Sequence, residues 1–151
     1  MDFQEFITIA REIGCVRYPD MEKRHNRYSY YGCIGSSPEQ TAWNNRHPEK
    51  AFFEESWRTG GEQGGSCWDD GTEDHHCPIN GDIEPPMTDL DELLLKVAPN
   101  ISFLVYRNLE NKLLERDERC ENEYYGNYTN YGIKRINIKK LYDYLVEHGV
   151  F

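Results

Sequence analysis

The sequence TDLDELLLKVAPNISFLVYRNLENKLLER, residues 88–116, decides the fold class. Its first half repeats leucine and valine at helical spacing, begins at the capping pair Thr88-Asp89 and ends at Pro99. Asn100 is the predicted N-cap of a second helix that runs to about Arg116. The apolar faces of the two predicted helices consist of Leu90, Leu93, Leu94 and Val97, and of Ile101, Leu104, Leu109, Leu113 and Leu114.

Helix signals also stand at both ends of the chain. Asp2 and Glu5 have the spacing of a capping box, and the apolar repeat that follows them stops at Gly14. Asn137 is a predicted N-cap for a final helix that ends near Gly149. Between the ends, Ser37-Pro38 begins a further short helix, with proline in its favoured first position.

Strand signals are fewer. Residues 52–57 predict a strand or a second short helix, and residues 123–136 predict a hairpin that turns at Gly126-Asn127. Together these elements predict an α+β fold, in which terminal helices and the leucine-rich pair pack on a small antiparallel sheet. At 151 residues, the chain is expected to form a single domain spanning residues 1–151.

The sequence GGEQGGSCWDDGTEDHHCP, residues 60–78, fits neither helix nor strand and lies in an irregular, acidic, glycine-rich segment of about 58–87. Residues 54–92 contain twelve acidic side chains and Arg58 alone as a base, so they account for the net charge of −10. This charge disfavours nucleic acid as a direct ligand and favours a basic protein surface, although a merely solubilising loop is the alternative. The predicted partner-binding residues are Glu62, Asp69, Asp70, Glu73, Asp74, Asp82, Glu84, Tyr124, Tyr125 and Tyr128.

The same segment carries a dense set of metal-ligand side chains. Cys67, His75, His76 and Cys77 lie within eleven residues, and these are the donor types that zinc prefers. Neighbouring side chains diverge, so a ligand from elsewhere is easier to fit than four local ones, and Cys33 is the first choice, ahead of Cys120. The prediction is one structural zinc ion that organises this loop. The alternative is a buried thiol at Cys67 with exposed histidines.

Three classes of function are compatible with these features. A non-enzymatic inhibitor would use the acidic segment to bind its partner. A metal-dependent hydrolase or nuclease would use the acids and histidines around residues 69–77, but these lie in a glycine-rich loop without a scaffold. A protein interaction module without a defence role is the third. No apolar run has the length of a membrane span and the first residues are of mixed charge, so a cytoplasmic protein is expected.

The pairing of GGSCWD, residues 64–69, with EYYGNYTNYGIK, residues 123–134, resembles small proteins carried by phages and mobile elements of Gram-positive bacteria. With its small size and acidity, the chain is similar in type to anti-CRISPR proteins that act on the type II effector nuclease, some of which carry a structural zinc. The resemblance implies an inhibitor of a host defence enzyme that acts in the host cytoplasm. It implies no catalytic residue.

Overall fold

The computed structural model describes residues 1–22, 30–31, 37–58, 87–121 and 129–151. Its backbone divides into two compact units. The helical unit comprises Met1–Glu54, Thr88–Leu114 and Arg135–Phe151, and the strand unit comprises Glu55–Met87 and Glu115–Lys134. Both units are discontinuous in sequence. Each of them includes residues that follow the central acidic segment.

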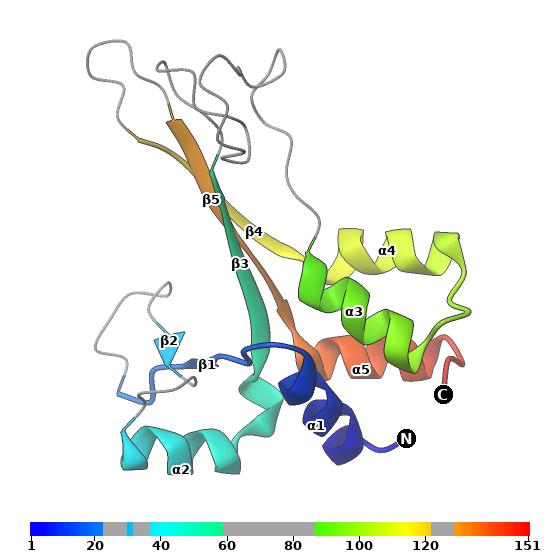
Figure 1. Ribbon diagram of the computed structural model, residues 1–151, viewed down its shortest axis with the longest axis horizontal. Coiled ribbons are helices and arrows are strands. Elements are labelled where there is room, and N and C mark those ends of the chain that lie inside the picture. The colour runs from blue at the N-terminus through cyan, green and yellow to red at the C-terminus, as the bar shows by residue number, and fades with distance from the viewer. Residues whose placement is uncertain (23–29, 32–36, 59–86, 122–128) are drawn as a thin grey trace. The chain divides into compact units, whose positions relative to one another are not determined.

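The α+β fold class is confirmed. The described residues form five α-helices and a three-stranded antiparallel sheet in the order β3-β5-β4, together with a short pair of strands (Figure 1). The helices are α1 (Phe3–Ile13), α2 (Pro38–Arg46), α3 (Thr88–Val97), α4 (Phe103–Leu113) and α5 (Ile138–Glu147), with a 3-10 turn η1 at Pro48–Lys50. The strands are β1 (Tyr18–Pro19), β2 (Tyr30–Tyr31), β3 (Phe52–Arg58), β4 (Glu115–Glu121) and β5 (Thr129–Asn137).

Local capping explains where several helices begin. Asp2 and Glu5 form the predicted capping box, and Ser37 accepts a hydrogen bond from the Gln40 N–H with Pro38 in the first turn of α2. Asn137 caps α5 by accepting from the Lys140 N–H, as predicted. At the other end of α5, His148 is the C-cap, and Gly149 follows it with a φ of 69°, the left-handed conformation that glycine favours.

Two boundaries in the leucine-rich pair were wrongly predicted. Ser102, not Asn100, caps α4, and its side chain accepts a hydrogen bond from the Val105 N–H at 3.2 Å. The helix then ends at Leu113, because the residues from Glu115 onward form β4 and not a last helical turn. The hairpin prediction is therefore correct in its second strand, whereas its first strand begins earlier than expected. The predicted turn at Gly126-Asn127 lies outside the described residues.

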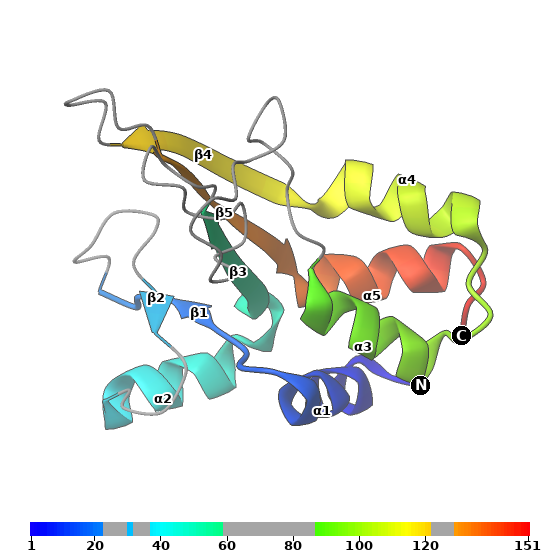
Figure 2. The same ribbon diagram turned by 45° about the horizontal axis from the view of Figure 1, so that its top comes forward.

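The core of the helical unit is formed by the inward faces of its helices. Helix α1 contacts both α3 and α5, and α5 also contacts α4 and η1 (Figures 1 and 2). The side chains with no exposed surface include Phe6 and Ala10 of α1, Leu90 and Leu93 of α3, Leu109 of α4, and Leu141 and Leu145 of α5. Burying such side chains is the main driving force for folding this unit.

Buried polar groups tie α2 to the segment that follows β1. Gln40 is 2% exposed, and its amide nitrogen donates to the Pro19 carbonyl at 3.0 Å and to Asn44 Oδ1 at 2.7 Å. Its amide oxygen accepts from the Met21 N–H at 3.0 Å. The side chain thus satisfies two backbone groups, and buried polar groups are usually hydrogen-bonded in this way.

The central strand β5 alternates between buried and half-buried side chains. Gly132, Lys134 and Ile136 are buried, whereas Ile133 and Arg135 are partly exposed. Alternation with a period of two residues is what the pleat of a strand produces. None of the described helices is both long and apolar enough to cross a membrane.

Candidate protein-binding face

The residues that the sequence singled out lie outside the described part of the chain. This holds for the predicted metal ligands Cys33, Cys67, His75, His76 and Cys77. It holds equally for the acidic and tyrosine residues predicted to bind a partner, from Glu62 to Tyr128. Among the residues that are described, no three His, Cys, Asp or Glu side chains are grouped in a way that suits a metal ion. The zinc site and the acidic binding surface therefore stay predictions.

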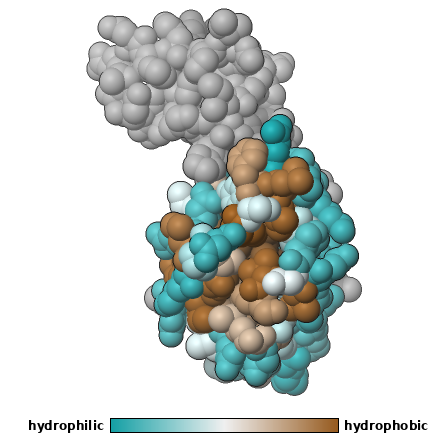
Figure 3. Space-filling model, turned by 90° about the vertical axis from the view of Figure 1, so that its right-hand side faces the viewer, coloured by the Kyte–Doolittle hydropathy of each residue, from teal (hydrophilic) through white to brown (hydrophobic). Residues whose placement is uncertain are grey.

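The described residues contain a different candidate, an apolar end face of the helical unit. Leu95 of α3 is 72% exposed, and Phe103 and Leu104 of α4 are 74% and 67% exposed. Met1, Val146 and Phe151 are also large apolar residues with considerable exposure. Apolar side chains gather on the side of the molecule shown in Figure 3. We use "apolar end face" for Leu95, Phe103, Leu104 and the two hollows described below.

The start of α4 explains why this face is exposed. With Ser102 as the cap, Phe103 and Leu104 lie in the first turn, and Leu109 is the buried residue of the helix. The prediction that Leu104 shares the inward face with Leu109 is wrong, because residues five apart point about 140° apart on a helix. Phe103 and Leu104 consequently face away from the core.

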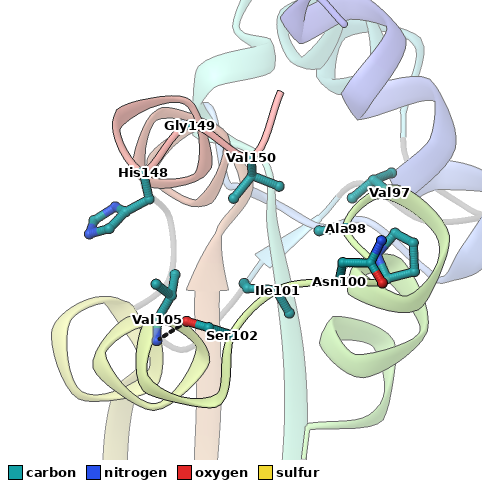
Figure 4. Close-up of a pocket in the computed structure, with 10 residues that line it drawn as sticks. Val97, Ala98, Asn100, Ile101, Ser102, Val105, His148, Gly149 and Val150 are labelled. Atoms are coloured by element: carbon teal, nitrogen blue, oxygen red, sulfur yellow. Dashed lines mark hydrogen bonds between the residues drawn. The ribbon is translucent and has the colours of Figure 1, made fainter.

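The larger hollow lies between the α3–α4 connection and the end of α5, and has a volume of about 390 Å³ (Figure 4). Ile101, Val105 and Val150 contribute apolar wall, and Ser102, Asn100 and His148 contribute polar groups. The His148 ring stacks on that of Tyr144 with centroids 4.1 Å apart, and its Nδ1 lies 2.9 Å from the Tyr144 carbonyl oxygen. This wall of the hollow is thus fixed by α5 itself.

Tyr144 fixes the position of α5 against α4. It is 4% exposed, and its hydroxyl donates to the Val105 carbonyl at 3.0 Å. Burial, with a smaller contribution from Glu147, raises the pKa of the Tyr144 phenol. The phenol therefore keeps the proton that this hydrogen bond requires.

A second hollow of about 270 Å³ lies between α3 and α4. Leu94, Leu95, Ala98, Pro99 and Ile101 form its apolar lining, and Asp91 and Tyr106 form its polar edge. The Tyr106 hydroxyl lies 2.5 Å from Asp91 Oδ1 and 3.0 Å from Glu110 Oε1. Burial and both carboxylates raise the pKa of Tyr106, so its hydroxyl is a hydrogen-bond donor and not a base.

A partly buried carboxylate lies elsewhere in the helical unit. Glu54 Oε1 is 3.5 Å from the Arg17 guanidinium, and Oε2 is buried without a hydrogen-bond partner among the described residues. Burial raises the pKa of Glu54, although Arg17 and Arg135 act in the opposite direction. Strongly perturbed carboxyls are common at functional sites, but Glu54 lines neither hollow of the apolar end face.

The pKa of Glu54 gives a test of stability against pH. Because the folded state binds this proton more tightly than the unfolded chain, Glu54 favours folding below its ordinary pKa and loses that contribution as pH rises through the raised value. The stability of the Glu54→Gln variant relative to the wild type should therefore rise as the pH increases from the ordinary pKa of a glutamate through the raised pKa of Glu54. Urea unfolding at several pH values measures this difference. A difference that stays constant with pH would contradict the assignment.

Cys15 is disulfide-bonded. The chain has five cysteines, and the other four, Cys33, Cys67, Cys77 and Cys120, have no described side chains, so the partner is one of them. Disulfides are rare in reducing compartments, so this bond differs from what a cytoplasmic location leads one to expect.

In comparisons with known proteins, no family model, curated protein or solved structure matches this chain.

Proposed function

We propose that the protein is a non-enzymatic, acidic inhibitor of the anti-CRISPR type, which binds a basic surface of a type II effector nuclease. The observation that carries the protein-binding part is the apolar end face. Leu95, Phe103 and Leu104 are each about two-thirds exposed or more, and Leu95 also lines the smaller hollow. Grouped apolar side chains of this kind on a soluble surface mark contact sites for other molecules.

The composition of this face suits a protein partner. Its apolar residues stand beside charged ones, including Asp91 and Lys96 on α3 and Arg107 on α4. An apolar centre with a polar rim is the usual arrangement of protein–protein interfaces, where aromatic residues such as Phe103 contribute much of the binding energy.

The charge of the chain supports a basic partner. The net charge is −10, and twelve of the 27 acidic residues lie within residues 54–92. A concentrated field of one sign accelerates and orients the encounter with a surface of the opposite sign. Type II effector nucleases hold nucleic acid in positively charged channels, which an acidic protein can occupy.

A cleavage assay tests this function. A guide-loaded type II effector is mixed with increasing amounts of the protein before target DNA is added. We expect cleavage to stop once the protein is in molar excess, and inhibition to weaken as salt is raised, because salt screens exposed charges. Full cleavage at saturating protein would contradict the proposal. Degradation of DNA by the protein itself, dependent on added divalent metal, would favour the nuclease alternative.

We also propose that the central segment holds one structural zinc ion, with Cys67, Cys77, His75 or His76 and a more distant residue such as Cys33 as ligands. Metal analysis of protein purified without added zinc should give about one equivalent per chain. Cys67→Ser and Cys77→Ser should each lower zinc content, stability and partner binding together, because metal binding and folding are coupled. Zinc-free protein that still binds its partner would contradict this proposal.

Titration of the free thiols distinguishes cysteines in a disulfide from cysteines that bind zinc. The bond at Cys15 leaves three of the five thiols for titration after denaturation in the presence of a chelator and without reductant. Five titratable thiols would mean that the purified protein carries no disulfide.

A further inference from the structure

The hollow between α3 and α4 combines an apolar lining with a negatively charged edge. Leu94, Leu95 and Ile101 are part of its apolar wall, together with Ala98 and Pro99. Leu95 is 72% exposed and so offers most of its surface to a bound molecule. The edge is formed by Asp91 and Tyr106.

At this edge, two carboxylate groups lie around a hydroxyl group that has a single hydrogen to donate. The Tyr106 hydroxyl carries one hydrogen, yet it lies within hydrogen-bond distance of carboxylate oxygens from both Asp91 and Glu110. It can therefore donate to only one of them at a time, and the other oxygen meets a lone pair. An ammonium or guanidinium group, with several donors and a positive charge, is the chemical complement of such a pair of carboxylates.

The two lysines of the same helices interact with other groups. Lys96, the only basic residue of α3, lies 3.5 Å from Glu12 of α1. On α4, the Lys112 ammonium lies 5.8 Å from the centre of the Tyr144 ring. Among the described residues, the contacts of these two lysines are thus with groups other than Asp91 and Glu110.

We propose that this hollow binds one face of a basic amphipathic helix of the partner, with an apolar side chain against Leu95 and a lysine or arginine at Asp91 and Glu110. Residues four apart on such a helix lie on the same face, so one segment supplies both groups. The inference rests on the proposed function, since it names the part of that partner which this face contacts. A second copy of the chain is the less suitable occupant, because two molecules of charge −10 repel each other.

Binding of a synthetic peptide to the full-length protein tests the proposal. The probe is an amphipathic helix of leucine and lysine, and its matched control replaces every lysine by glutamate. Fluorescence anisotropy should show binding of the lysine peptide and none of the glutamate peptide. Leu95→Gln and the double variant Asp91→Asn/Glu110→Gln should each weaken binding about tenfold or more, the loss expected for one buried leucine or one charge-assisted contact.

A matched variant removes the same charge from other helices. Glu39 of α2 and Asp143 of α5 are exposed and lie outside both hollows, so Glu39→Gln/Asp143→Asn should change affinity less than about twofold, as expected of remote surface charges. Equal weakening by the two double variants would mean attraction by net charge alone and would overturn the site. Unchanged binding of the lysine peptide by the Leu95→Gln variant would also overturn the site. Self-association of the protein that Leu95→Gln abolishes would assign the hollow to a second copy.

The same variants separate this inference from the proposed function. If the wild type inhibits the effector nuclease and Leu95→Gln and Asp91→Asn/Glu110→Gln inhibit it equally well, the hollow is not the contact and the proposed function stands. If the wild type fails to bind the nuclease but binds the lysine peptide through the hollow, the site stands and the proposed function fails. Unchanged urea midpoints in the variants show that they are folded.

Discussion

Replacing Phe6 by alanine is expected to lower the free energy of unfolding by about 3–5 kcal/mol, whereas the same replacement at Phe103 should change it by less than about 0.5 kcal/mol. Phe6 has no exposed surface, and its ring meets those of Tyr142 and Phe151 edge-on, with centroids 5.4 and 5.8 Å apart. Its removal leaves a cavity that rigid neighbours fill only in part. Urea unfolding followed by circular dichroism measures both values.

The binding effects of the two variants should have the opposite order. Phe103 is 74% exposed, so its truncation leaves the fold intact but removes a large aromatic side chain from the apolar end face. We expect Phe103→Ala to weaken partner binding by about 2 kcal/mol or more, as central aromatic residues of interfaces do. A Phe103→Ala protein that binds as well as the wild type would remove this face from the interface. One that unfolds as easily as Phe6→Ala would show that Phe103 belongs to the core.

Neutralising four acids of the central segment is expected to slow association with the effector nuclease about tenfold or more at low salt. The variant carries Asp69→Asn, Asp70→Asn, Glu73→Gln and Asp74→Asn. Because the lost attraction acts over a distance, the difference from the wild type should shrink as salt is raised. Association rates measured at several salt concentrations give both quantities.

The control for this variant removes four acids from the helical unit. Glu39, Glu49, Asp143 and Glu147 are exposed there, and changing them to their amides alters the net charge by the same amount. A smaller effect of this control on the association rate would show that the position of the charge matters. An equal effect would contradict a binding role for the central segment, and would leave it as the solubilising loop of the alternative hypothesis.

Much of the fold could be predicted because its signals are local. The capping box at Asp2 and Glu5, the Ser37-Pro38 start and the Asn137 cap depend on residues within one turn, and all three were correct. The predicted start of α4 was wrong because Asn100 and Ser102, which are two positions apart, are both good capping residues. Strand β4 was missed because ERDERCE, the sequence of Glu115–Glu121, has little strand propensity, and pairing with β5 decides its structure.

The apolar end face could not be predicted from the sequence. A helical repeat shows which residues share a face, but not which faces the other helices cover. Leu95 and Leu94 are adjacent leucines in one run, yet they are 72% and 3% exposed, because neighbouring helices cover only one side of α3. The chemistry predicted for the central segment, by contrast, comes from its composition alone, and that segment lies outside the described residues. Tyr106 and Glu110 are four residues apart on α4, a spacing that the sequence shows, but the contact of Tyr106 with Asp91 of α3 depends on how the two helices pack.

Isothermal titration of the protein into a guide-loaded type II effector nuclease is the most direct test of the central claim, that an acidic, apolar-faced protein binds a basic partner. We predict a single one-to-one binding event at about physiological ionic strength, whose affinity falls as salt is raised because exposed charges are screened. If the protein is folded and the nuclease is active in the calorimeter, absence of binding across the salt range would contradict this claim.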